Sequence, residues 1–405
     1  MYTTIWNPAY IYRSTTPPHS SYELIMERHR YIMTKRSWSD LRIELLCLVA
    51  QRLSFFDLVR FGVLCKNWRQ AVLDGVLGRP VNDMPWCMNY AWFEHEGKII
   101  SILELSDLVA KQTYSVGQII REEARELFVG AKVCASKKGW LLLSKKSTGH
   151  SCVFFFYSPF CNKIIELPPL ELKCGIYEHA ATFTKVPISP DGCHVYVIFG
   201  CDDSIKSCNL RNRTWSTISI RNNLCHRRIY DLVYFDGILL CNFRSSYLGA
   251  FTTELQVWET MDLFPILRTS LQRQEWDSPS KSYLVEESDG KLYWLVCVYW
   301  WHALQFDRSN NKWVRVKSKS YGEVFKKRTV FYGCPLSIST CPLVGEASDE
   351  FAGKTFYKTE IDILSERCIK FQNKSQVKWD FELLWKENLL RAAMIQLPDS
   401  IEYNK

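Results

Sequence analysis

Between residues 38 and 69, apolar side chains recur at the spacing of α-helices. Ser39 or Asp40 offers a side-chain oxygen as the first helix cap, and residues 54–57 supply a polar break with a second cap. The first apolar stripe consists of Leu45, Leu46, Val49 and Leu53, and the second consists of Leu58, Phe61, Leu64, Cys65 and Trp68. The pattern predicts two or three short, packed helices.

These helices carry more apolar side chains than a short helical unit can hide. Isolated helices of this length are marginal in water, so another surface must cover the remaining apolar face. One interpretation is that a partner protein receives this face in a groove. The alternative is a helical hairpin that caps the domain that follows it in the chain.

From about residue 85 the pattern changes to strands, and a two-part unit repeats. The first part is a glycine followed by a strand-like run, and it begins at Gly97, Gly139, Gly192, Gly237 and Gly290. The second part is a strand, a polar turn and another strand, with turns at residues 162–163, 212–213 and 311–312. The glycines lie roughly forty to fifty-five residues apart, a spacing typical of four-stranded propeller blades.

The predicted fold class is therefore α+β and multidomain, with a three-helix N-terminal domain and a mainly-β, propeller-like domain. An irregular β-sandwich is the alternative. Outside the first domain we expect helices only at residues 122–128 and near 381–393. The expected boundaries are 1–36 for a flexible extension, 37–78 for the helical domain, 85–380 for the β domain and 381–405 for a C-terminal helix or tail.

The helical segment carries a characteristic series of residues: Leu41, Glu44-Leu45-Leu46, Val49, Arg52-Leu53, Asp57-Leu58, Arg60-Phe61 and Cys65-Lys66-x-Trp68-Arg69. In the order and spacing of these residues the segment resembles the F-box. The sequence departs from that family at Arg42, where proline is usual, and at Gly62 inside a helix. The resemblance implies docking to a Skp-family adaptor, and through it to a cullin. The predicted adaptor-binding residues are Leu41, Leu45, Leu46, Val49, Leu53, Leu58, Phe61, Leu64, Cys65 and Trp68.

The β-rich region is similar to the plant-type, kelch-like C-terminal domain of unknown function, class 295. The likeness is carried by Cys134-x-Ser136-x-x-Gly139-Trp140-Leu141, Ser158-Pro159-Phe160 with Ile165-Glu166-Leu167-Pro168-Pro169, and Lys312-Trp313-Val314 with Gly322 and Phe331-Tyr332-Gly333. Ser158 stands where that family usually has asparagine. The resemblance implies a β-rich domain that holds a protein target, and it implies no chemistry.

Composition supports a large core and gives no sign of a membrane protein. Hydrophobic residues make up 47% of the 405 residues and charged residues only 23%. No apolar run approaches the ~20 residues of a membrane span, and no secretory signal is visible, so we expect the nucleus or the cytoplasm. The 16 cysteines include no C-x-x-C pair. They are expected to be free thiols that pack as small hydrophobic residues.

No catalytic, cofactor or metal site is predicted. Residues 353–355, Gly-Lys-Thr, lack the first glycine of a phosphate-binding loop, so a turn that opens a strand is the better interpretation. The histidines occur singly. Net charge is +8, with basic clusters at residues 28–36 and 137–146, and an ordinary basic surface explains it without nucleic-acid binding.

These observations predict a non-catalytic, substrate-recognition subunit of a Skp–cullin–F-box ubiquitin ligase with an unknown protein substrate. A propeller enzyme, or a protein that binds a small molecule or glycan, is the first alternative. A nucleic-acid-associated protein ranks below it.

Overall fold

The computed structural model describes a subset of the chain, which divides near residue 80 into two compact units. The described residues are 41–50, 53, 55–76, 85–95, 98–107, 112–115, 126–147, 150–160, 162–172, 179–189, 192–200, 203–220, 229–243, 247–262, 281–287, 290–297, 301–316, 329–334, 336–340, 355–357 and 391–395. The predicted flexible extension, residues 1–36, lies outside them.

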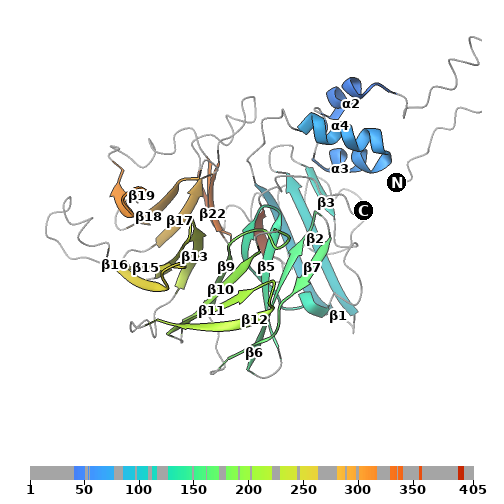
Figure 1. Ribbon diagram of the computed structural model, residues 1–405. Coiled ribbons are helices and arrows are strands. Elements are labelled where there is room, and N and C mark those ends of the chain that lie inside the picture. The colour runs from blue at the N-terminus through green and yellow to red at the C-terminus, as the bar shows by residue number, and fades with distance from the viewer. Residues whose placement is uncertain are drawn as a thin grey trace, which may run out of the picture. The chain divides into compact units, whose positions relative to one another are not determined.

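The first unit contains three described helices: α2 (Ile43–Ala50), α3 (Phe55–Leu64) and α4 (Lys66–Val76) (Figure 1). Acidic residues lie in the first turns of α2 and α3, where they suit the helix dipole. The second predicted stripe is divided between two helices, because Cys65 lies between α3 and α4 outside either helix. None of the described helices is long and apolar enough to cross a membrane.

The second unit is a five-bladed β-propeller built from five described sheets (Figure 1). The first sheet contains β1 (Trp86–His95), β2 (Lys98–Asp107), β3 (Gln112–Ser115) and β24 (Arg391–Ile395). The second contains β4 (Lys132–Lys137), β5 (Trp140–Lys146), β6 (Ser151–Ser158), β7 (Lys163–Glu166) and β8 (Leu170–Glu171). The third contains β9 (His179–Phe183), β10 (His194–Phe199), β11 (Ser204–Asn209) and β12 (Thr214–Ser219).

The fourth and fifth sheets come from the second half of the propeller. The fourth contains β13 (Ile229–Phe235), β14 (Ile238–Phe243), β15 (Tyr247–Thr252) and β16 (Val257–Asp262). The fifth contains β17 (Lys281–Glu287), β18 (Leu292–Cys297), β19 (Trp301–Asp307) and β20 (Lys312–Arg315), and β21 (Thr329–Cys334), β22 (Leu336–Thr340) and β23 (Thr355–Tyr357) extend it. This architecture excludes the irregular sandwich.

In the second to fifth blades the repeat seen in the sequence corresponds to two turns, whereas Gly97, the first of the repeated glycines, lies outside the described residues. The first turn contains a glycine with positive φ, and these residues are Gly139, Gly192, Gly237 and Gly290. The second turn is a four-residue loop whose last residue is left-handed, and these residues are Asn162, Arg213, Gln256 and Asn311, with φ between 49° and 54°. Sequence reasoning found three of these second turns and missed the one at Gln256, because no asparagine marks it.

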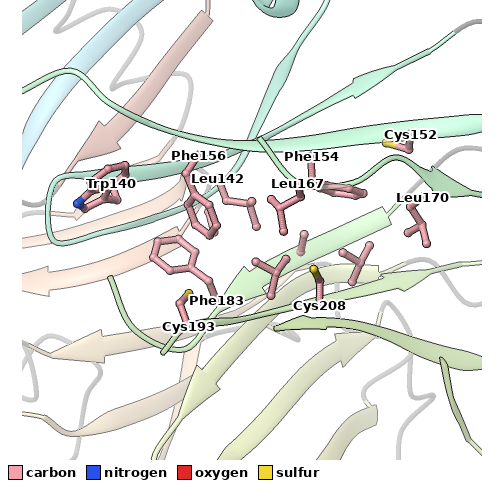
Figure 2. Close-up of a cluster of buried hydrophobic side chains, with 14 of the residues drawn as sticks. Trp140, Leu142, Cys152, Phe154, Phe156, Leu167, Leu170, Phe183, Cys193 and Cys208 are labelled. Atoms are coloured by element: carbon pink, nitrogen blue, oxygen red, sulfur yellow. The ribbon is translucent and has the colours of Figure 1, made fainter. Parts of the chain in front are cut away.

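Apolar side chains from neighbouring blades pack together in three clusters. The first joins the β4–β8 sheet to the β9–β12 sheet and contains Leu142, Phe156 and Phe183 (Figure 2). The second joins the β9–β12 sheet to the β13–β16 sheet, and the third joins the β13–β16 sheet to the β17–β20 strands. The second to fifth blades are therefore held together by apolar contacts between neighbours.

The expected C-terminal helix is wrong where the structure describes it. Residues 391–395 form β24, which pairs antiparallel with β1 and so adds the end of the chain to the first blade. Hydrogen bonds to the exposed edge of β1 therefore override the helical pattern, and the propeller extends beyond the predicted boundary at residue 380. Residues 381–390 lie outside the described part. Of the other expected helix, residues 126–128 are helical and 122–125 are not described.

Candidate functional site

Helix α2 places four large apolar side chains on its accessible surface. The exposed fractions are 36% for Ile43, 49% for Leu45, 57% for Leu48 and 44% for Val49. The opposite side of the helix is buried, with Leu46 at 1% and Ala50 at 0%. Residues four apart lie on the same face of a helix, so Leu46 and Ala50 point inward together while Leu45 and Val49 point outward. We name Ile43, Leu45, Leu48 and Val49 the α2 ridge.

Helices α3 and α4 supply the interior of the helical unit. Leu58 is 2% exposed and Phe61 is 6% exposed, and the rings of Phe61 and Trp68 have centroids 4.1 Å apart. At the end of α3, Leu64 is 67% exposed. In the second stripe, Leu58 and Phe61 are therefore core residues and Leu64 is exposed.

The structure separates the ten predicted adaptor-binding residues into three groups. Leu45, Val49 and Leu64 are exposed; Leu41, Leu53, Cys65 and Trp68 are half-buried; and Leu46, Leu58 and Phe61 are buried. The last group packs inside the unit, which corrects the assignment of adjacent Leu45 and Leu46 to one stripe. Sequence reasoning missed Ile43 and Leu48. The 3–4 residue spacing of Leu45, Leu48 and Val49 was the signal that could have found Leu48.

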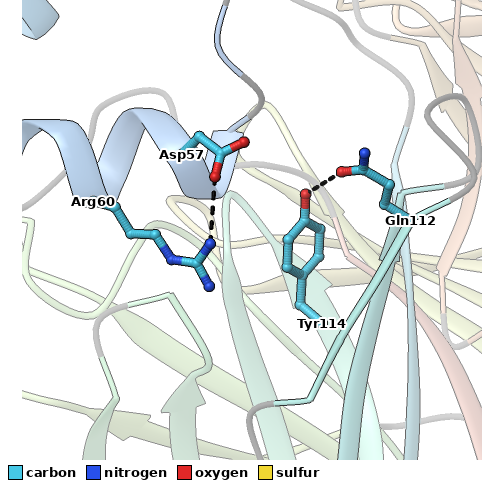
Figure 3. Close-up of polar contacts among 4 residues, drawn as sticks. All are labelled: Asp57, Arg60, Gln112 and Tyr114. Atoms are coloured by element: carbon cyan, nitrogen blue, oxygen red, sulfur yellow. Dashed lines mark hydrogen bonds and ion pairs between the residues drawn. The ribbon is translucent and has the colours of Figure 1, made fainter. Parts of the chain in front are cut away.

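Polar contacts organise the helical unit around these apolar groups. Arg60 lies 3.3 Å from Asp57 on the surface of α3 (Figure 3), and such exposed pairs contribute little to stability. Arg69 Nε donates to the carbonyl oxygen of Gly62 at 3.3 Å, and Cys47 Sγ donates to that of Ala71 at 3.6 Å. The carbonyl of Gly62 is one of the last four of α3, which lack partners within the helix, and Arg69 supplies a donor for it. The helix continues past Gly62 to Leu64, so this glycine does not end it.

A cluster of potentially nucleophilic groups lies between two blades of the propeller. Ser144 Oγ lies 3.1 Å from Cys134 Sγ and 2.9 Å from His179 Nε2. Cys134 is the extra residue of a β-bulge between β4 and β5, a feature often found beside active sites. Burial raises the pKa of the Cys134 thiol to about 11. Since the thiolate is the nucleophile, this cysteine is unsuited to covalent catalysis.

Ionisable groups near the inner strands make contacts with other residues of the propeller. Lys137 Nζ donates to the carbonyl oxygen of Tyr234 at 3.5 Å and lies 4.0 Å from Glu286 Oε2, so one lysine connects three blades. Burial raises the pKa of Asp231 to about 7, and the amides of Leu232 and Leu284 donate to its carboxyl group. Among the described residues, no group of three His, Cys, Asp or Glu side chains could hold a metal ion.

A cavity of about 460 Å³ lies beside the outer strands of the fifth sheet. Its polar lining includes Lys291, Gln305, Asp307, Arg308 and Arg315. Arg308 also donates to the carbonyl oxygen of Gly290 at 2.9 Å and lies 3.4 Å from Asp236. Among the described residues that line this cavity, Asp307 is the one carboxylate.

Comparison with known proteins assigns both units. The F-box domain family matches residues 38–79, and the family described as the KIB1-4 beta-propeller matches residues 106–343. These matches confirm the predicted F-box and propeller. The kelch-like likeness stays a prediction.

The curated relatives are F-box proteins of Arabidopsis thaliana. F-box/kelch-repeat protein At1g57790 is 26% identical over 57% of this chain and 61% of its own length. F-box protein At3g56470 is 24% identical over 58% of each chain. The chain thus spans about three-fifths of the length of these relatives. With a family model that matches more than half of its residues, the chain belongs to the KIB1-4 β-propeller family and carries an F-box domain ahead of the propeller.

Proposed function

We propose that this protein is the substrate-recognition subunit of a Skp–cullin–F-box ubiquitin ligase. F-box domains generally bind Skp1-type adaptors. The observation that carries the proposal is the exposed α2 ridge, together with Leu64, inside the segment that matches the F-box. Full burial of a leucine side chain is worth about 1.5–3 kcal/mol. A few such side chains in an adaptor groove provide the central contacts of a specific interface.

The propeller is the part that holds the target in this proposal. A propeller presents loops from successive blades on its two faces, and such loops are common binding sites. The subunit itself makes and breaks no bonds. It raises the effective concentration of the target beside a recruited conjugating enzyme, which is a proximity effect. The nucleus and the cytoplasm, where such ligases work, are the proposed locations.

The test is a double substitution in the α2 ridge. Leu45→Asp/Leu48→Asp places two charges on an exposed surface, so the full chain should fold as before, while the apolar contact with the adaptor is lost. We expect co-purification with a Skp-type adaptor to fall by about 100-fold or more, since removing two anchor residues costs about 3 kcal/mol or more.

The matched control is Leu255→Asp, because Leu255 is 73% exposed in the propeller. This variant should bind the adaptor as the parent does. The proposal fails if the parent chain does not bind a Skp-type adaptor. It also fails if the α2 variant, with an unchanged circular dichroism spectrum, binds as tightly as the parent.

A further inference from the structure

Four turns of the second and third blades lie at the same end of their strands. In the second blade the register pairs Lys137 with Trp140 and Ser158 with Lys163, so both turns of that sheet are at one end. In the third blade it pairs His194 with Asn209, which is followed by the turn to β12. This end of the two sheets is called the turn face.

Contacts between the blades bring these turns together. The rings of Phe156 and Phe183, each within two residues of a strand end, have centroids 5.1 Å apart across the blade interface (Figure 2). Within the third blade, Arg211 Nε lies 3.3 Å from the point where a Cβ on Gly192 would be. The four turns therefore lie at the same end of two blades that pack directly against each other.

The turn face is strongly basic. From each strand end to the next strand start, the four turns (137–140, 158–163, 183–194 and 209–214) contain six basic residues and one acidic residue. One of the six, Lys137, contacts Glu286 within the propeller. The equivalent turns of the β13–β16 and β17–β20 blades (235–238, 252–257, 287–292 and 307–312) contain three basic and five acidic residues. On the basic half, Lys138, Lys163, Arg211 and Arg213 are exposed. These four residues are named the basic patch.

Two members of the basic patch occupy backbone positions that favour other residues. Lys138 has φ 48°, and the equivalent position in the fourth blade holds Asp236. Arg213 has φ 49°, where two other blades hold Asn162 and Asn311. The left-handed conformation is unfavourable for residues with a Cβ, and Asn and Asp tolerate it best. A long cation at both positions thus opposes the local preference of the turn, and residues in such unfavourable conformations cluster at functional sites.

We propose that the basic patch binds an acidic, Asp- and Glu-rich polypeptide segment. This inference rests on the proposed function, since that segment would be the part of the target that the propeller recognises. Complementary charge steers association and selects partners. A nucleic-acid surface would interleave basic and aromatic side chains. In these turns Trp140 is buried and Phe160 packs on Trp86, with centroids 6.4 Å apart.

The experiment uses the full chain and a fluorescent twelve-residue peptide of glutamates. Lys138→Asn/Arg213→Asn removes two cations and introduces the residue that both turns favour, so its melting temperature should equal or exceed that of the parent. We expect the variant to bind the peptide about five- to tenfold more weakly at low salt, with a shallower dependence on salt concentration. The matched control, Lys312→Gln, removes an exposed cation from the other half and should leave peptide affinity unchanged.

Three results would overturn the inference: no binding by the parent at low salt, equal binding by parent and Asn variant, or tighter binding of a single-stranded oligonucleotide of equal charge. The last result would indicate a nucleic-acid surface instead. Adaptor co-purification is measured on the same samples, and the Asn variant should retain it. Failure of peptide binding with intact adaptor binding contradicts this inference alone, whereas loss of adaptor binding by the parent contradicts the proposed function.

Discussion

Helix α2, IELLCLVA, and strand β5, WLLLSKK, are both rich in leucine, yet they place their side chains differently. In β5 the consecutive residues Trp140 to Leu143 are at most 4% exposed. In α2, Leu45 and Leu48 are about half exposed, although Leu46 between them is buried. Successive strand residues point to opposite faces, and both faces of this blade are covered. A helix that is covered on one side leaves the other side accessible, so apolar content alone does not predict burial.

The largest expected difference in stability is between a leucine-to-alanine substitution in β5 and the same substitution in α2. Leu142→Ala removes a fully buried side chain from the core of Figure 2 and should lower the free energy of unfolding by about 2–5 kcal/mol. Leu48→Ala, at 57% exposure, should change it by about 0.5 kcal/mol or less. Urea denaturation of both variants measures the difference. Similar losses in the two variants would show that α2 is covered as completely as β5.

A second test asks how tightly the propeller is packed. A Cβ on Gly249 would lie 2.2 Å from Cζ2 of Trp258, whose ring covers this glycine from the neighbouring strand β16. Gly249→Ala should therefore cost about 1–3 kcal/mol through overpacking. Thermal melting of Gly249→Ala in the parent and in a Trp258→Ala background separates the clash from other effects. Equal costs in both backgrounds would contradict the close contact.

The smallest expected effect concerns pH. The folded-state pKa of Asp231 is raised from 3.8 to about 7 by burial, so the folded protein holds a proton that the unfolded chain releases earlier. This contribution is fully favourable below about pH 4 and is lost as pH rises toward 7. Asp231→Asn cannot ionise, so it should reduce the fall in unfolding free energy between pH 6 and pH 8 by about 1–2 kcal/mol.

The control for this measurement is the parent chain at the same two pH values. Burial lowers the pKa of His194 and His302, so these groups favour the folded state as pH rises through their range, opposite to Asp231. They are present in both proteins and cancel in the comparison. An unchanged pH dependence in the Asn variant would show that Asp231 is ionised in the folded protein.

Much of the propeller could be predicted because its turns require particular residues. Gly139, Gly192, Gly237 and Gly290 all adopt positive φ, as the repeated glycines indicated. The strand at 391–395 could not be predicted, because its partner β1 lies about 300 residues earlier in the chain. Helical periodicity is a local signal, whereas the pairing of β24 depends on which edge the rest of the fold leaves open.

For the candidate site, the sequence identified the F-box segment, but it did not separate exposed from buried apolar residues. Leu46, Leu58 and Phe61 are interior residues, and the exposed Ile43 and Leu48 were not among the predicted ones. Adjacent leucines such as Leu45 and Leu46 are equally apolar, and their sequence does not say which one faces the neighbouring helices.

By itself the sequence determined the order of the two units, the helical and strand periodicities, and the glycine turns that set the blades. These follow from local chemistry: side-chain spacing, capping groups and backbone conformations that few residues adopt. The tertiary structure decided which leucines of α2 remain exposed, that the end of the chain joins the first blade, and that cations of two blades gather on one face. Each of these depends on distant residues becoming neighbours, which local patterns do not specify.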